Sequence, residues 1–168
     1  MDLFKNHANT QSPSAIWLLI GLNTLVFILQ VLNRYSTQGG ASGEIEPTKG
    51  TLQAALQQVV KHGNIEDLAL VPSHLYNRPV ENAPTLVSSM FAHANLSHLL
   101  LNMLGLYQFG RPLQSKLGFW KTLAIYLAGG VGSNLIYSLT HPTSDTGLIG
   151  ASAGVSAVLM AYLVEFGK

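Results

Sequence analysis

The sequence predicts an all-α protein, a polytopic bundle of helices that cross a membrane. Charged residues account for only 10% of the 168 residues, whereas about 25% is typical of soluble domains. Of the nine basic and eight acidic residues, nine lie between Arg34 and Glu81. The rest of the chain therefore carries very little charge, as is expected where helices face lipid.

Four apolar segments are long enough to span a bilayer, and they cover residues 16–32, 90–109, 119–139 and 148–166. A helix rises about 1.5 Å per residue, so about 20 residues cross an apolar layer of about 30 Å. Because lipid cannot satisfy backbone N–H and C=O groups, each segment is expected to be helical.

The first apolar segment is predicted to be a retained span and not a signal peptide. The residues that follow it, Asn33-Arg34-Tyr35, lack the small residues of a cleavage site. We therefore expect a short cytoplasmic tail at residues 1–14, followed by one membrane domain at residues 15–168.

The stretch between the first two spans, residues 33–84, is polar and is predicted to be an external loop. Within it, residues 51–62 have apolar side chains at helical spacing. A short amphipathic helix is therefore expected there, on the membrane surface or against the protein.

The charges of the two short links between spans predict the orientation. The link between the second and third spans carries Arg111, Lys116 and Lys121, whereas the link between the third and fourth carries only Asp145. By the positive-inside rule the first of these links and the N-terminus are cytoplasmic. We expect an integral protein of a bacterial inner (plasma) membrane, with the lipid bilayer as a partner. The sequence has no basic patch that would indicate nucleic-acid binding.

Polar side chains within the second and fourth segments are of interest, because such groups are costly in lipid and often functional. The second contains His98 and Asn102, whose spacing places them on one face of a helix, and His93 lies near its external end. The fourth contains Ser152 within Gly-Ala-Ser-Ala-Gly. Acyl transfer needs a nucleophile and hydrogen-bond donors aimed at the developing oxyanion, and this set supplies both.

Each feature also has a purely structural interpretation. A histidine within a span can pack against a carbonyl group, small residues around Ser152 are typical of helix contacts, and Ser152 itself can bond to a carbonyl one turn earlier. His93 and His98 make only a weak case for a metal site, because no carboxylate or cysteine lies beside them in sequence, so no metal or cofactor is expected. The glycines of the third segment are interpreted as packing positions: Gly129, Gly130 and Gly132.

In combination, these residues resemble the rhomboid family of intramembrane serine proteases. Residues 88–118, in which three residues separate His98 from Asn102, are similar to that family's second core helix and the loop after it. Residues 149–162, with Gly-x-Ser ending at Ser152, are similar to its fourth core helix. The resemblance covers roughly residues 15–168 and implies a rhomboid-like bundle with four of six core helices present.

The resemblance also implies a role for each polar residue. Ser152 would be the nucleophile that attacks a peptide carbonyl in the transmembrane segment of a substrate protein. His98, Asn102 and the backbone N–H of Ser152 would form the oxyanion hole, and His93 would support that region. Water would reach the serine from the external side.

Three positions depart from the family's pattern. Ala153 follows the serine where glycine is usual, Ser156 stands where some members carry an aromatic residue, and Gln114 stands where glutamate is common. The first two concern catalytic geometry, and the third concerns stability.

The family's general base is a histidine on the sixth core helix, whereas this sequence stops after the fourth. Its six histidines are at positions 7, 62, 74, 93, 98 and 141. We therefore expect a truncated rhomboid protease, with little or no proteolytic activity from the 168 residues alone. One alternative is a complete, non-catalytic rhomboid-like protein that binds transmembrane clients. Another is an unrelated channel or transporter in which His98 and Asn102 line a polar path.

Overall fold

The structure, a computed structural model, describes residues 14–38 and 65–167. The helices in these ranges are α1 (Ala15–Gln38), α3 (Ile65–Leu68), α4 (Pro72–Asn77), α5 (Pro79–Asn82), α6 (Thr85–Ser88), α7 (Leu96–Leu117), α8 (Phe119–Thr140) and α9 (Ser152–Phe166). The amphipathic helix expected at residues 51–62 and nearly all of the expected tail lie outside the described residues.

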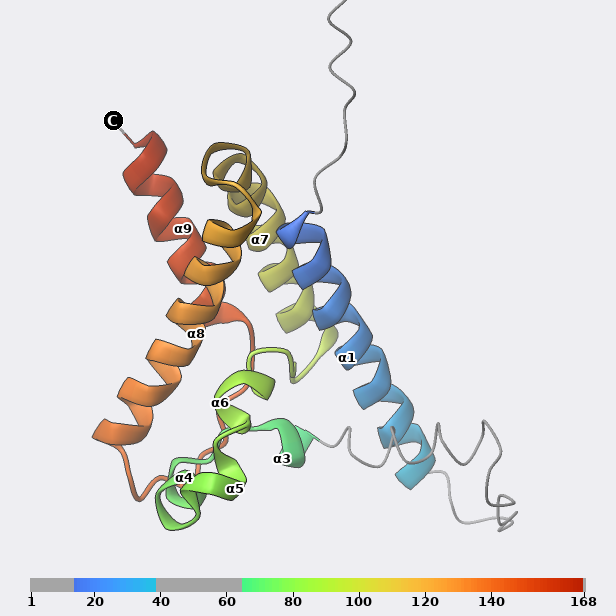
Figure 1. The fold of residues 1–168 in the computed structure, drawn as a ribbon. Helices are drawn as coiled ribbons and strands as arrows, with labels where there is room; N and C mark the ends of the chain where they lie inside the picture. The colour runs from blue at the N-terminus through green and yellow to red at the C-terminus, as the bar shows by residue number, and fades with distance from the viewer. Residues whose placement is uncertain (1–13, 39–64, 168) are drawn as a thin grey trace, which may run out of the picture.

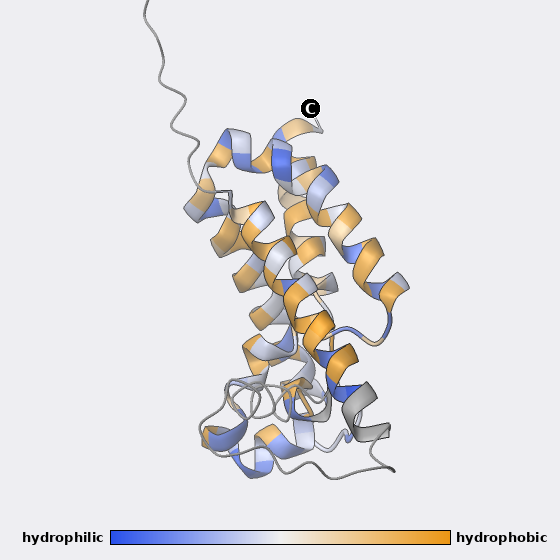
Figure 2. Cartoon of the chain, turned by 90° about the vertical axis from the view of Figure 1, so that its right-hand side faces the viewer, coloured by the Kyte–Doolittle hydropathy of each residue, from blue (hydrophilic) through white to orange (hydrophobic). Residues whose placement is uncertain are grey.

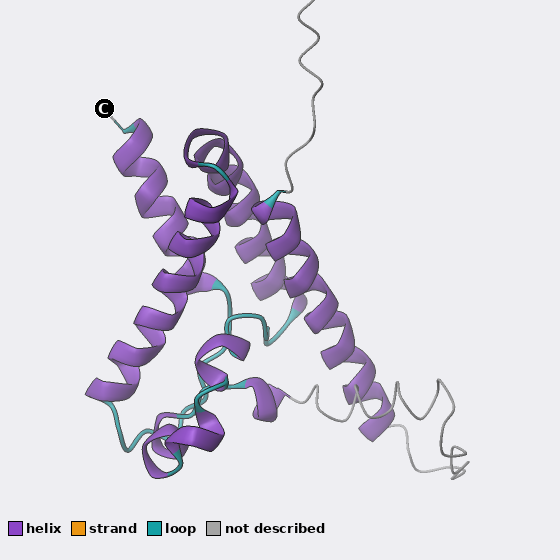
Figure 3. Ribbon diagram, viewed as in Figure 1, coloured by secondary structure: helices purple, strands orange, loops and turns teal. Residues whose placement is uncertain are grey.

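Four long helices form a bundle, and the short helices gather at one end of it. Figure 1 shows the long helices α1, α7, α8 and α9, with α3 to α6 gathered between the lower ends of α8 and α1. α7 and α9 both begin partway along the bundle, so the connections that lead into them run through its interior (Figure 3). In the described ranges there is no strand, only an isolated antiparallel bridge between Leu70 and Leu148. The all-α prediction is therefore confirmed for these ranges.

Two of the helices are long and apolar enough to cross a membrane. They are α1, over Ala15–Arg34, and α8, over its whole length, whereas α9 is apolar but has only 15 residues. Figure 2 shows hydrophobic residues along the helices of the bundle. By this measure, two of the four predicted spans are supported.

The predicted start of the second segment was wrong, because α7 begins at Leu96 and not at residue 90. Asn95 is its N-cap, and the Asn95 side chain accepts a hydrogen bond from the His98 backbone N–H at 2.8 Å. Such a cap satisfies one of the free N–H groups of the first turn. The helix also continues past residue 109 to Leu117, with Pro112 inside it.

The predicted start of the fourth segment was also wrong, because α9 begins at Ser152 and not at residue 148. Gly150 has a φ of 116°, a backbone conformation that a helix does not contain and that only glycine adopts readily. The residues up to Ala151 are therefore not helical, and Ser152 is the first residue of the helix.

Small residues bring α8 and α9 close together. A Cβ added at Gly129 would lie 2.2 Å from the Cβ of Ala157, and one added at Gly154 would lie 2.9 Å from the backbone oxygen of Tyr126. Gly130 faces the flexible side chain of Met90, whereas Gly132 has open space around it. Two of the three α8 glycines therefore lie at packed positions.

Gln114 of α7 holds the beginning of α1. Its Oε1 accepts hydrogen bonds from the Ser14 hydroxyl at 3.3 Å and from the Ile16 backbone N–H at 3.2 Å. The side chain thus reaches across the bundle to satisfy an N–H group that the first turn of a helix leaves free.

Replacing Gln114 with glutamate is expected to stabilise the bundle. A carboxylate at the same place would keep the two acceptor contacts and add a favourable interaction with the positive end of α1, worth about 0.3–1 kcal/mol. Thermal unfolding in detergent at pH 8 should show a higher midpoint for Gln114→Glu and a lower one for Gln114→Leu. A midpoint for Gln114→Glu at or below that of the parent protein would contradict this account.

Candidate active site

Ser152 is the first residue of α9, and its side chain is exposed. Within the described part of the chain, the Ser152 hydroxyl makes no hydrogen bond. The hydroxyl is thus free to meet a substrate or a base.

The backbone around Ser152 supplies hydrogen-bond donors. The first helical hydrogen bond into this turn runs from Val155 N to Ala151 O at 2.9 Å, and no side chain caps the helix. The N–H groups of Ser152, Ala153 and Gly154 therefore lie ahead of the regular helical ladder. Such N–H groups, together with the helix dipole, favour a negative charge placed beside them.

The imidazole of His98 lies directly against Gly150, two residues before the serine. A Cβ added at Gly150 would be 2.7 Å from His98 Cε1 and 2.8 Å from His98 Nε2. Any side chain at this position would displace the ring. The contact brings a residue of the first turn of α7 beside the segment that carries Ser152.

Asn102 lies one turn further along α7 than His98 and is buried. Its Nδ2 donates a hydrogen bond to the His98 backbone oxygen at 2.9 Å. An amide nitrogen carries two hydrogens, so one donor of Asn102 remains available beyond this contact.

His93 lies in the connection before α7 and is fully buried. Its ring meets that of His98 edge-on, with 5.0 Å between the ring centroids. Its Nδ1 lies 3.2 Å from the Phe91 backbone oxygen, so that nitrogen carries the proton in this arrangement. Within the described residues no group of three metal-binding side chains forms around these two histidines.

The segment before the serine is held by backbone hydrogen bonds. Gly150 N donates to Ser89 O at 2.8 Å, and Leu148 N donates to Leu70 O at 2.8 Å. The Ser73 hydroxyl also donates to the Asp145 carboxylate at 2.6 Å. The connection between α8 and α9 is therefore anchored to the segment at residues 70–89.

His141 lies at the end of α8 and is engaged there. Its ring stacks on that of Tyr137 with 4.4 Å between centroids, and its Nδ1 lies 2.9 Å from the Thr140 hydroxyl. These contacts are with its own helix.

The sequence pattern pointed to Ser152, His98, Asn102 and His93 but missed other parts of this region. Gly150 entered only as part of a motif, and its positive φ could not be read from the sequence. Gln30 of α1, which contacts His93, was missed entirely, although a glutamine inside an apolar segment is itself a signal.

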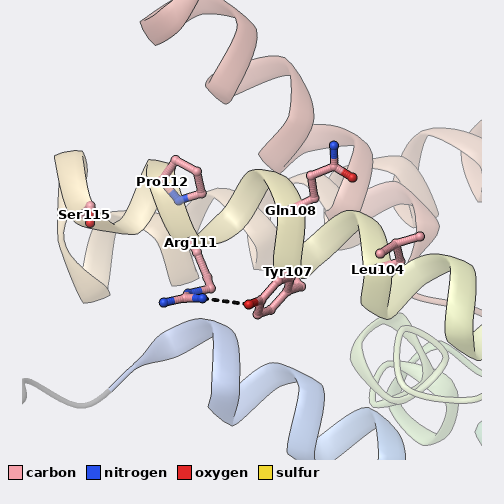
Figure 4. Close-up of a pocket in the computed structure, with 6 residues that line it drawn as sticks. All are labelled: Leu104, Tyr107, Gln108, Arg111, Pro112 and Ser115. Carbon is pink, nitrogen blue, oxygen red and sulfur yellow. Dashed lines mark hydrogen bonds between the residues drawn. The ribbon is translucent and has the colours of Figure 1, made fainter.

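A separate hollow of about 560 Å³ lies on the surface of α7, and it is lined by Leu104, Tyr107, Gln108, Arg111, Pro112 and Ser115 (Figure 4). Two of the lining residues are bonded to each other, because Arg111 donates a hydrogen bond to the Tyr107 hydroxyl at 2.8 Å. The hollow contains none of the predicted site residues.

The chain belongs to the rhomboid family, because the family model of the Rhomboid domain matches residues 81–168, half of the chain. This is a membrane-embedded family. The match includes α7, α8, α9 and all four predicted site residues.

Several curated relatives carry rhomboid names. The mitochondrial RHOMBOID-like protein 12 of Arabidopsis thaliana is 32% identical over 93 residues, which cover 45% of this chain and 27% of that protein. The mitochondrial Presenilin-associated rhomboid-like protein A of Danio rerio is 38% identical over 78 residues, 46% of this chain and 20% of that protein. Rhomboid-like protease 5 of Toxoplasma gondii is 33% identical over 81 residues, 48% of this chain and 10% of that protein.

The aligned regions thus span about a quarter or less of these relatives' lengths. No solved structure matches the chain.

Proposed function

We propose that this chain carries the nucleophile and the oxyanion hole of an intramembrane serine protease that cleaves transmembrane segments of other proteins. The observation that carries the proposal is the contact between His98 and Gly150. It places an imidazole beside the turn that presents an exposed serine at the start of a helix.

In the proposed reaction the Ser152 oxygen attacks the carbonyl carbon of the scissile peptide bond and gives up its proton to a general base. The carbonyl oxygen becomes an oxyanion, which the Ser152 N–H, the free donor of Asn102 and His98 stabilise. The C–N bond then breaks, and the amine leaves with the proton returned by the base. Water hydrolyses the resulting ester and frees the serine.

The general base is a further requirement of the proposal. Serine is a weak nucleophile unless an adjacent base removes its proton. In the described residues, neither His93 nor His98 is hydrogen-bonded to Ser152. We therefore expect the histidine base to be a group other than these two, and we expect slow reaction wherever that base is missing.

We propose that the serine opens toward the non-cytoplasmic side, with the N-terminus in the cytoplasm. The basic residues in the last two turns of α7 and the first turn of α8 support this orientation by the positive-inside rule: Arg111, Lys116 and Lys121. A bacterial plasma membrane remains a prediction from sequence. The curated relatives named above include mitochondrial proteins.

The test is covalent labelling of Ser152 by a fluorophosphonate in membranes that contain the natural gene product with this sequence. We expect labelling of the parent protein and none of Ser152→Ala. His98→Ala should lower the labelling rate about 10²–10³-fold, the usual cost of one oxyanion-hole donor.

Ser115→Ala is the matched control, because Ser115 is an exposed helical serine in the hollow on α7, which contains none of the predicted site residues. It should label at the parental rate. Equal labelling of parent and Ser152→Ala, or no labelling of a folded parent protein, would reject the protease.

A second candidate function is the binding of transmembrane clients without cleavage. The free Ser152 hydroxyl, which has no imidazole partner among the described residues, favours it. It requires that a transmembrane peptide with a photoreactive residue crosslinks to parent and Ser152→Ala equally, with no peptide cleaved.

A further inference from the structure

Gln30 is a polar residue buried at a place where lipid-facing helices normally carry none. It lies in the apolar part of α1 and is only 2% exposed. Burying an amide in such a helix is costly unless the amide has partners. The position therefore needs a reason beyond packing.

The partner of Gln30 is the segment that leads into α7. The Oε1 of Gln30 accepts a hydrogen bond from the His93 backbone N–H at 3.1 Å. One turn later on α1, the Arg34 guanidinium donates to the Ala94 backbone oxygen at 3.4 Å and 3.5 Å. Two neighbouring residues are thus held by one helix, His93 through its backbone donor and Ala94 through its backbone acceptor.

These two contacts lie immediately before the residues that orient His98. Asn95 follows Ala94 and caps α7 through the His98 N–H at 2.8 Å. The His93 ring meets the edge of the His98 ring. His98 in turn lies against Gly150, two residues before Ser152.

We propose that Gln30 and Arg34 form a clamp on residues 93 and 94 that positions the His98 imidazole beside the segment carrying Ser152. This inference deepens the proposed function and rests on it for its catalytic consequence. Gln30 is a positioning residue: it acts through His93 and His98 and does not touch the serine.

Asn23 shows what a buried amide on α1 does without this contact. It is also fully buried, and its Nδ2 donates to the Leu19 oxygen of its own helix at 2.7 Å, while its side chain also interacts with Tyr126 of α8 and not with the segment before α7. Asn23 and Gln30 are seven residues apart and so lie on the same face of α1. A variant at Asn23 therefore controls for the general effect of removing a buried amide.

The experiment compares four forms of the natural gene product: parent, Gln30→Met, Gln30→Glu and Asn23→Leu. Methionine has a similar length but no acceptor for the His93 N–H, whereas glutamate keeps an acceptor oxygen. Fluorophosphonate labelling is measured well below the unfolding midpoint of every form. Gln30→Met should label about fivefold to tenfold more slowly than the parent, as loss of one buried hydrogen bond would allow.

Gln30→Glu should recover most of the parental rate, and Asn23→Leu should keep it even if its unfolding midpoint falls. A parental labelling rate for Gln30→Met would overturn the clamp. So would a slowing of labelling by Gln30→Glu and Asn23→Leu that equals the slowing by Gln30→Met. These outcomes separate positioning from a loss of stability alone.

A second readout does not depend on catalysis. Nuclear magnetic resonance of ¹⁵N-labelled histidine should show displaced His93 amide and His98 ring resonances in Gln30→Met but not in Asn23→Leu. If the parent protein is not labelled by the probe, the proposed function fails, and these spectra decide the clamp by themselves. Unchanged His98 ring resonances in Gln30→Met would reject it.

Discussion

Replacing Gly150 with alanine is expected to reduce labelling of Ser152 to the level of Ser152→Ala. The added Cβ would lie 2.7 Å from the His98 ring, well inside contact distance, and the φ of 116° strains any residue other than glycine. Backbone strain of this kind costs about 1–3 kcal/mol. The ring or the turn must move, and either movement separates the imidazole from the serine segment. Labelling rates and unfolding midpoints of the detergent-solubilised gene product measure the two effects.

Gly118→Ala is the matched control for this prediction. Gly118, between α7 and α8, also has a positive φ of 85°, but a Cβ there would have open space around it. It should lower the unfolding midpoint and leave the labelling rate unchanged. If Gly118→Ala and Gly150→Ala slowed labelling equally, backbone strain and not the His98 contact would explain the loss.

Replacing Gly154 with alanine is expected to destabilise the packing of α8 against α9. Its Cβ would lie 2.7 Å from Tyr126 Cδ2 and 2.9 Å from the Tyr126 backbone oxygen, which cannot move without shifting α8. Overpacking of this kind costs about 1–3 kcal/mol. Because about 1 kcal/mol changes the midpoint by about 2–4 °C in a chain of this length, the loss should be measurable by thermal unfolding.

Gly132→Ala provides the comparison, because no atom lies within 4 Å of a Cβ added there. Alanine is favoured over glycine in a helix by about 0.5–1 kcal/mol, so this variant should hold or raise the midpoint. A fall as large as that of Gly154→Ala would show that loss of glycine, and not the contact with Tyr126, is responsible.

The sequence was sufficient for those features that depend on composition and spacing. Low charge and apolar runs predicted an all-α membrane bundle, and the spacing of His98 and Asn102 predicted one face of α7. The starts of α7 and α9 were misplaced because apolar residues continue through the connections before them. Hydropathy does not distinguish an apolar turn from an apolar helix.

Local signals could have corrected one of these boundaries. Asn95, three residues before His98, is a favoured capping residue just ahead of an apolar run, and it marks the true start of α7. The conformation of Gly150 had no such signal, since glycine in a small-residue motif is equally common at helix contacts. The contact of Gln30 with His93 joins residues 63 positions apart in sequence, and periodicity within one helix cannot reveal it.

The bridge between Leu70 and Leu148 makes the loop before the serine part of a larger cooperative unit. The amides of Leu70, Ser73, Leu148 and Gly150 all donate to backbone oxygens across this junction, so none can open to solvent without loosening the others. Amides that share an opening event exchange their hydrogens at a common rate. Hydrogen–deuterium exchange should therefore protect and release these four amides together. A perturbation that separates α9 from the segment before it should then raise exchange at Leu70 and Ser73 as well, although these residues are distant in sequence from α9.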